Sequence, residues 1–216
     1  MNLDPMNTST IRIDQALLDV RKAYRLLYDY QRVVLDTVDY IGNQFGLKYI
    51  GGWPKFSGPA PRNGGGKLTC WSWDWLNMVL YDFHFAEKSG DEDCLRLSVL
   101  LISDTGYFCA EDETVGNLNV AGYLVPERSA TKLGFFISGS QWMGVPNWEQ
   151  KGTMKAFIQE GKLPSEYAEK GIIGRCVDLA RLASEQQTND MLDELVLVAN
   201  RSGIPLQRIS PKAKTL

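Results

Sequence analysis

The alternation of apolar side chains between Trp71 and Phe85 constrains the fold more than any other feature of the chain. In this stretch every odd-numbered position except Asn77 is bulky and apolar. The apolar members are Trp71, Trp73, Trp75, Val79, Tyr81, Phe83 and Phe85. A repeat of two residues is typical of a β-strand with one buried face. A strand of this length is unusual, so we expect a bulge or break near Leu76–Asn77.

A second strand is predicted over Cys94–Asp104, after a charged, glycine-containing loop at 87–93. If Ala86 pairs with Cys94, the apolar residues of both strands face one another. The predicted opposing pairs are Phe85–Leu95, Phe83–Leu97, Tyr81–Val99 and Val79–Leu101. A slip of one residue would bring polar side chains into this face. The sequence therefore predicts an antiparallel ribbon over 76–104 with its aromatic side turned inward.

The opposite face of this ribbon carries polar residues. The same register places His84 opposite Arg96 and Asp82 opposite Ser98. Two interpretations stay open for this group. It is either a solvated polar patch or the centre of a site.

A second pattern, over Ile13–Phe45, has the spacing of a helix about 50 Å long. Apolar residues recur in alternating steps of three and four, with Gln31 as the one polar member. The stripe consists of Ile13, Leu17, Val20, Tyr24, Leu27, Gln31, Val34, Val38, Ile41 and Phe45. We expect Ser9 or Thr10 to cap the helix and Gly46 to end it.

Two arrangements of this helix remain open. In the first it packs along the sheet and is broken at Gly42. In the second, part of the stripe binds a protein partner or a second copy of the chain as a coiled coil. Gln31 would then set the register, as single polar residues do in coiled-coil seams.

The rest of the chain predicts further strands followed by helices. Residues 46–67 have the composition of a loop, and Leu68 after Lys67 excludes a phosphate-binding loop at Gly64–Lys67. The expected strands are 117–125 and 132–138. The expected helices are 147–159, one starting at Pro164 or Ser165, one around 176–183, and 190–199 ended by Gly203.

The predicted fold class is α+β: a long N-terminal helix, an antiparallel meander of about four strands, and C-terminal helices. We predict a single domain over 13–203. A flexible leader at 1–12 precedes it and an extended basic tail at 204–216 follows it.

Composition excludes several classes of function. The net charge of −3 argues against a dedicated nucleic-acid binder. A single histidine, His84, excludes multi-histidine metal centres, and the four cysteines contain no Cys-x-x-Cys pair. We expect no cofactor. The chain contains no signal-peptide pattern and no apolar run of membrane-spanning length, which predicts a cytoplasmic protein.

Candidate site residues fall into two groups. The carboxylates and imidazole of a metal-dependent phosphodiester hydrolase would be Asp82, His84, Asp104 and Glu111. The candidates for a binding surface are Trp53, Arg96, Trp142 and Trp148, because tryptophan and arginine are enriched at interface hot spots.

The leading hypothesis is a non-enzymatic cytosolic interaction protein, such as an adaptor, inhibitor or assembly subunit. It would bind a protein partner or itself through the 13–45 helix. It rests on the apolar-striped helix and on the lack of a catalytic motif. The alternatives are the phosphodiester hydrolase, and a tryptophan-lined module that binds a ligand or single-stranded nucleic acid.

Overall fold

The computed structural model describes residues 5–55, 80–87, 94–110, 120–139 and 151–209. The chain divides into two compact units, Met1–Tyr40 and Ile41–Leu216, which are described separately. The first unit contains most of helix α1 (Pro5–Gln44). The second contains the last turn of α1, the sheet and the remaining helices.

A five-stranded antiparallel sheet organises the second unit. Its strands follow one another in space as they do in sequence. They are β1 (Lys48–Lys55), β2 (Leu80–Ala86), β3 (Arg96–Ile102), β4 (Lys132–Ser138) and β5 (Ile172–Asp178). The long N-terminal helix, the antiparallel meander and the C-terminal helices confirm the predicted α+β class.

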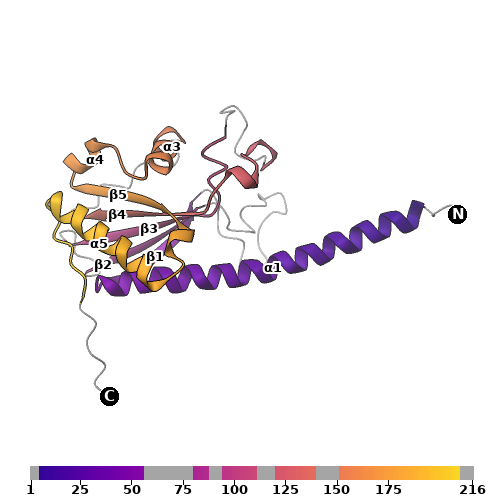
Figure 1. Ribbon diagram of the computed structural model, residues 1–216, viewed down its shortest axis with the longest axis horizontal. Coiled ribbons are helices and arrows are strands. Elements are labelled where there is room, and N and C mark those ends of the chain that lie inside the picture. Colours follow the sequence, from indigo (N-terminus) through magenta and orange to yellow (C-terminus); the bar gives the residue numbers. More distant parts are fainter. Residues whose placement is uncertain (1–4, 56–79, 88–93, 111–119, 140–150, 210–216) are drawn as a thin grey trace, which may run out of the picture. The chain divides into compact units, whose positions relative to one another are not determined.

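Helices of the second unit cover both faces of the sheet, α3 (Lys151–Glu160) and α4 (Ser165–Glu169) on one side and α5 (Glu185–Arg201) on the other (Figure 1). On the even-numbered face, the ring of Phe157 in α3 lies 4.8 Å from that of Phe136 in β4. On the odd-numbered face, Arg175 of β5 forms an ion pair with Glu194 of α5 at 3.6 Å. The sheet is therefore the middle layer of this unit.

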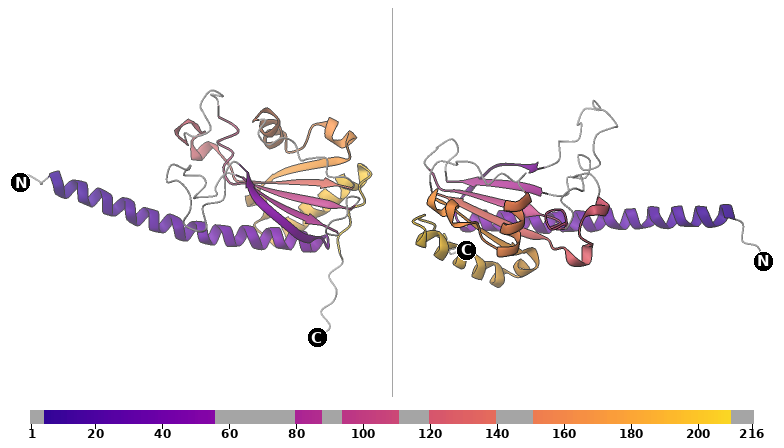
Figure 2. Two further views of the ribbon diagram at one scale, coloured as in Figure 1. Left: turned by 180° about the vertical axis from the view of Figure 1, so that it is seen from behind. Right: turned by 90° about the horizontal axis from the view of Figure 1, so that it is seen from above.

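The core lies on both sides of that layer. One buried cluster occupies the even-numbered face: Leu80, Leu100, Ile102, Tyr107, Phe108, Phe136, Met154, Phe157, Ile158, Leu163, Ile172 and Cys176. On the other face, α5 buries Met191, Leu192, Leu195 and Ala199. Figure 2 shows the twist of the sheet between these layers.

The β2–β3 hairpin differs from the predicted register by two residues. Ala86 pairs with Arg96 rather than with Cys94, and Phe83 faces Val99. A shift of two keeps every side chain on its predicted face, so the apolar alternation alone does not select between the two registers. The hairpin also continues past the strand end, where the Glu87 amide donates to the Leu95 carbonyl at 3.1 Å.

Two strands were not predicted. β1 lies within the expected loop, because its Gly51, Gly52 and Pro54 are usual turn residues. It is an edge strand, where proline is tolerated, and its register shifts between Tyr49 and Gly51. β5, at the other edge, replaces the start of the helix expected around 176–183, and a short 3-10 helix (Leu179–Leu182) follows it.

Other boundaries match the predictions more closely. β4 has the predicted bounds of 132–138, and α4 begins at Ser165 as expected. The expected strand at 117–125 is wrong over its described part, which contains a 3-10 helix at Val120–Gly122 and a second at Pro126–Arg128 just beyond it. The expected break near Leu76–Asn77 lies outside the described residues.

Helix α1 starts earlier than predicted and is not broken at Gly42. It begins at Pro5, so Ser9 and Thr10 lie inside the helix and do not cap it. Gly46 ends it as expected, with a φ of 66°, a conformation that glycine adopts at no steric cost. The Leu47 amide donates to the Gly42 carbonyl at 3.1 Å, which is the closing bond of a Schellman motif.

The first residues after α5 pack against the second unit. Ile204 and Leu206 are buried, and the Ile209 amide donates to the Gln44 carbonyl at 2.8 Å. The part of the predicted tail that the structure describes, up to Ile209, is therefore attached to the fold.

Candidate functional site

The predicted polar group forms at the β2–β3 pair. Asp82 is fully buried, and its carboxylate accepts a hydrogen bond from the Ser98 hydroxyl, which is also fully buried. The Nε2 atom of His84 lies 3.3 Å from the Oδ2 atom of Asp82, and the histidine side chain is 15% exposed. The alternation of side chains along the strands thus predicted correctly that these three residues lie on one face, although the observed register differs by two residues from the predicted one.

This polar group borders the apolar cluster of the same face. Leu80 and Leu100, which flank Asp82 along and across the strands, are members of that cluster. A buried carboxylate is tolerated only when hydrogen bonds or charges compensate its lost hydration. Ser98 supplies part of that compensation through its hydrogen bond, and the nearby His84 imidazole adds to it in its protonated form, so the contacts have a direct role in the stability of the sheet.

The contacts differ from those of a nucleophilic triad. In such a triad the histidine lies between the hydroxyl and the carboxylate and accepts the hydroxyl proton. Here the Asp82 carboxylate contacts both of the other groups, and the Ser98 hydroxyl donates its hydrogen bond to Asp82. The observed geometry therefore does not activate Ser98 as a nucleophile.

Arg96 lies at the end of the same hairpin and is half-buried. Its backbone partners are Ala86 on β2 and Ser138 on β4, and Ser138 is 1% exposed. Arg96 and Ser138 share the face of Asp82, which extends the polar end of this face to the third strand.

The remaining predicted catalytic residues do not join this group in the described structure. Asp104 follows the opposite end of β3 and accepts a hydrogen bond from the Gly106 amide at 2.7 Å, so it stabilises a turn. Glu111 lies outside the described residues. Within the described ranges, no three His, Cys, Asp or Glu side chains are arranged to hold a metal ion.

The predicted tryptophans give less information. Trp53 belongs to β1, where its backbone lies opposite Asp82, but its side chain is outside the described part of the structure. Trp142 and Trp148 also lie outside it.

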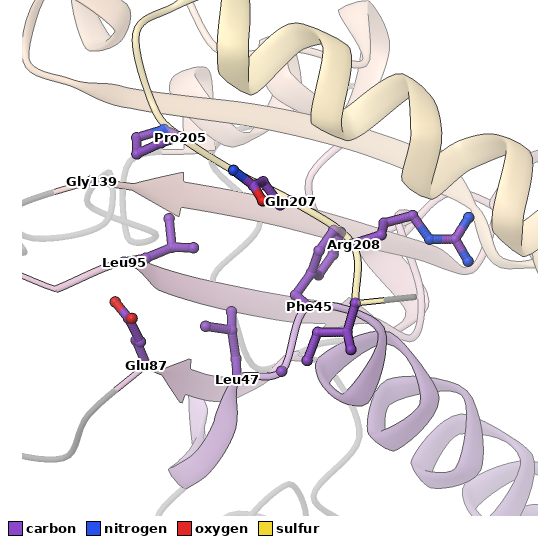
Figure 3. Close-up of a pocket in the computed structure, with 10 residues that line it drawn as sticks. Phe45, Leu47, Glu87, Leu95, Gly139, Pro205, Gln207 and Arg208 are labelled. Carbon is purple, nitrogen blue, oxygen red and sulfur yellow. The ribbon is translucent and has the colours of Figure 1, made fainter. Parts of the chain in front are cut away.

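A pocket of about 680 Å³ lies at one end of the sheet, between Leu47, Glu87 and Leu95 on one side and the 205–209 segment on the other (Figure 3). Phe45, Gly46, Gly139, Pro205, Gln207, Arg208 and Ile209 complete its lining. Sequence reasoning missed this pocket because five separate segments of the chain form it and none carries a motif.

The aliphatic part of the Arg208 side chain lines this pocket, whereas its guanidinium group points away from it (Figure 3). It donates to Asp193 at 2.9 Å, and to Gln44 and Asn189 at 2.6 Å each. These bonds attach the 204–209 segment to α5 and to the end of α1. The guanidinium group of Arg208 therefore has a structural role, because it holds this segment against both helices.

The third feature is the apolar stripe of α1 in the first unit. Five successive stripe positions are exposed: Ile13 by 58%, Leu17 by 51%, Val20 by 48%, Tyr24 by 62% and Leu27 by 39%. The positions on the opposite side of the helix are all polar: Gln15, Lys22, Asp29, Asp36 and Asn43. Residues 13–27, which we call the exposed stripe, thus form one apolar face of an amphipathic helix.

Farther along the same helix the stripe becomes buried. Val34 and Ile41 are fully buried, and Val38 and Phe45 are 3% and 6% exposed. None of the described helices combines the length and the apolar character needed to cross a membrane.

The fold defines an α+β protein in which a long helix precedes an antiparallel sheet. The family model described as PM0109 matches residues 10–203, and the chain belongs to this family. The chain is 51% identical over 37 residues to the uncharacterized protein PM0109 of Pasteurella multocida (strain Pm70). This match covers 17% of the chain and 18% of that relative. No solved structure matches the chain significantly.

Proposed function

We propose that this chain is a cytosolic interaction protein that binds a protein partner through the exposed stripe of α1. The observation that carries the proposal is the exposure of five successive apolar positions on one helix face. Large contiguous apolar surfaces on proteins usually mark interaction sites.

The free energy that would be gained by burying the exposed stripe supports this role. Burial of a large apolar side chain contributes about 1.5–3 kcal/mol relative to full exposure. The stripe residues are already part of a helix whose backbone is ordered, so binding there does not require folding of the segment. An amphipathic helix that presents apolar residues in steps of three and four fits a helical partner or a groove.

Among the described residues, Cys109 and Cys176 are free thiols. Free cysteines are typical of reducing compartments, which supports the cytosolic part of the proposal. The polar group around Asp82 is not part of this proposal, because its side chains contact one another inside the sheet and Asp82 is fully buried.

The test compares two double variants of the full chain. Leu17→Glu with Leu27→Glu places charges in the exposed stripe, whereas Lys22→Glu with Asp29→Lys changes the polar side of the same helix. Partners are isolated on tagged protein from cells that express the chain naturally, and each is then measured by calorimetry with purified components. We expect the stripe variant to lose binding and the polar-side variant to keep it.

Circular dichroism provides the control for folding of both variants. If every partner binds the stripe variant as tightly as the unchanged chain, the exposed stripe is not the interaction surface and the proposal is wrong.

A further inference from the structure

We infer that the partner of the exposed stripe is a second copy of this chain, bound antiparallel along residues 13–27. This inference rests on the proposed function and names its partner. The residues that flank the stripe support it: those on one side are charged, and those on the other side are small.

One flank of the stripe carries Asp14 and Arg21, both exposed. They are seven residues apart, so they lie on the same side of the helix about 10 Å from each other. Neither has an ion-pair or hydrogen-bond partner of its side chain within the described part of the structure. The flank therefore presents one negative and one positive charge at a fixed spacing.

The other flank, at the same seven-residue spacing, carries Ala16 and Ala23. Small residues let two helix backbones approach closely. In an antiparallel pair of helices, like flanks face each other, so the charged flanks meet and the alanine flanks meet. This differs from a parallel pair, in which each charged flank would face an alanine flank.

The charges select one antiparallel register. When Asp14 lies opposite Arg21 of the partner subunit, twofold symmetry forms the same ion pair a second time. A shift of one heptad toward the N-terminus places Asp14 opposite the partner's Asp14. A shift of one heptad toward the C-terminus places Arg21 opposite the partner's Arg21. Both shifts set like charges against each other.

The selected register also matches the apolar residues. It sets Leu17 against Val20 of the partner subunit and Tyr24 against Ile13 of the partner subunit, and symmetry repeats both layers. The overlap centres between Leu18 and Asp19, so it uses the exposed part of the stripe. A parallel, in-register dimer would align the same exposed positions, but its helices would also run side by side past Val34, where the stripe positions are already buried.

The experiment is a charge-reversal series on the purified full chain, measured by sedimentation equilibrium at low salt over a wide concentration range. The unchanged chain is expected to dimerise. Asp14→Arg and Arg21→Asp each replace two opposite-charge contacts with two like-charge contacts, and each is expected to weaken dimerisation by about tenfold or more. The double variant Asp14→Arg with Arg21→Asp is expected to restore it. Lys22→Glu, on the polar side, is the matched control and should dimerise like the unchanged chain.

Two results would overturn this inference. A chain that is monomeric at all concentrations contradicts the second copy as partner, whereas the proposed function then still predicts a different protein on the exposed stripe. A dimer that both single reversals leave intact contradicts the antiparallel register. The calorimetric test of the stripe variant against isolated partners decides the proposed function separately.

Discussion

Asp82 illustrates at the scale of one residue how this sheet accommodates a carboxyl group in its interior. The carboxylate is fully buried, accepts from Ser98 and lies beside His84. Each contact replaces part of the hydration that the carboxylate loses on folding. Ser98 is buried as well, so the two residues depend on each other.

Replacement of Asp82 by alanine is therefore expected to destabilise the fold by about 2–4 kcal/mol, because it leaves the Ser98 hydroxyl and His84 without the carboxylate. Urea unfolding measures the change. Glu127→Ala, at an exposed position, is the control and should stay within about 0.5 kcal/mol of the unchanged chain. A loss below about 1 kcal/mol for Asp82→Ala would contradict the assigned role.

The thiol of Cys176 gives a second prediction at this scale. Burial raises its pKa from the usual 9.0 to about 12, and the residue is 7% exposed. The thiolate is the nucleophile of cysteine chemistry, so little of it is present at neutral pH. We expect an alkylating reagent to modify Cys176 slowly in the native chain and rapidly in urea, as read by peptide mass spectrometry. Equal rates in both conditions would contradict burial of this thiol.

Among the elements, α1 ends in a close contact with the sheet that explains why Gly42 lies inside a helix. A β-carbon at this position would lie 2.4 Å from the Cε1 atom of Phe85. Phe85 is itself 3% exposed and its ring lies 5.5 Å from that of Tyr49. The phenylalanine ring thus has little room to move away.

Gly42→Ala is expected to destabilise the chain by about 1–3 kcal/mol, since overpacking outweighs the gain in helix propensity. Gly152→Ala in α3 is the matched control, because a β-carbon there meets nothing within 4 Å. The control should be neutral or up to about 1 kcal/mol more stable. A partial rescue by Phe85→Leu in the Gly42→Ala background would identify the ring as the cause. An unchanged melting temperature of Gly42→Ala would refute the contact.

The elements also show what a sequence reveals and what it does not. The strict alternation over Tyr81–Phe85 and Leu97–Leu101 predicts the faces of β2 and β3, because a strand repeats every two residues. The same repeat does not distinguish registers that differ by two, and the observed register differs by two. β1 was not predicted because its glycines weaken a strand and its proline is tolerated mainly at an edge, and a single sequence does not reveal which strand is at an edge.

The candidate site also combines contacts that the sequence predicts with placements that it does not predict. Asp82, His84 and Ser98 are predictable as neighbours because they are close in sequence or related by the hairpin parity. The position of Asp104 depends on a turn after β3, and the pocket near Glu87 depends on where the 205–209 segment runs. Local spacing carries no information about such long-range placements.

On the scale of the whole molecule, the sheet unit buries several weak acids in their neutral form. Burial raises the pKa of Tyr123 from the usual 10.0 to about 12 and also raises the pKa of Tyr107. The two rings lie 5.5 Å apart, and Tyr107 belongs to the buried cluster under α3. Cys176 belongs to the same cluster. All three side chains therefore lose their protons at higher pH in the folded chain than in the unfolded chain.

This coupling predicts how stability depends on pH. The folded chain holds these protons more tightly than the unfolded chain, so their contribution is complete only well below pH 9.0, the usual pKa of the Cys176 thiol, where both states are protonated. Between pH 10 and about pH 12 the unfolded chain releases the tyrosine protons first, and stability should fall. Urea unfolding at a series of alkaline pH values measures the slope. Tyr123→Phe removes one of the acids and should flatten the slope over this interval, whereas Tyr24→Phe, on the exposed stripe, should leave it unchanged. A slope that is the same in all three chains would show that the buried tyrosines do not drive the loss.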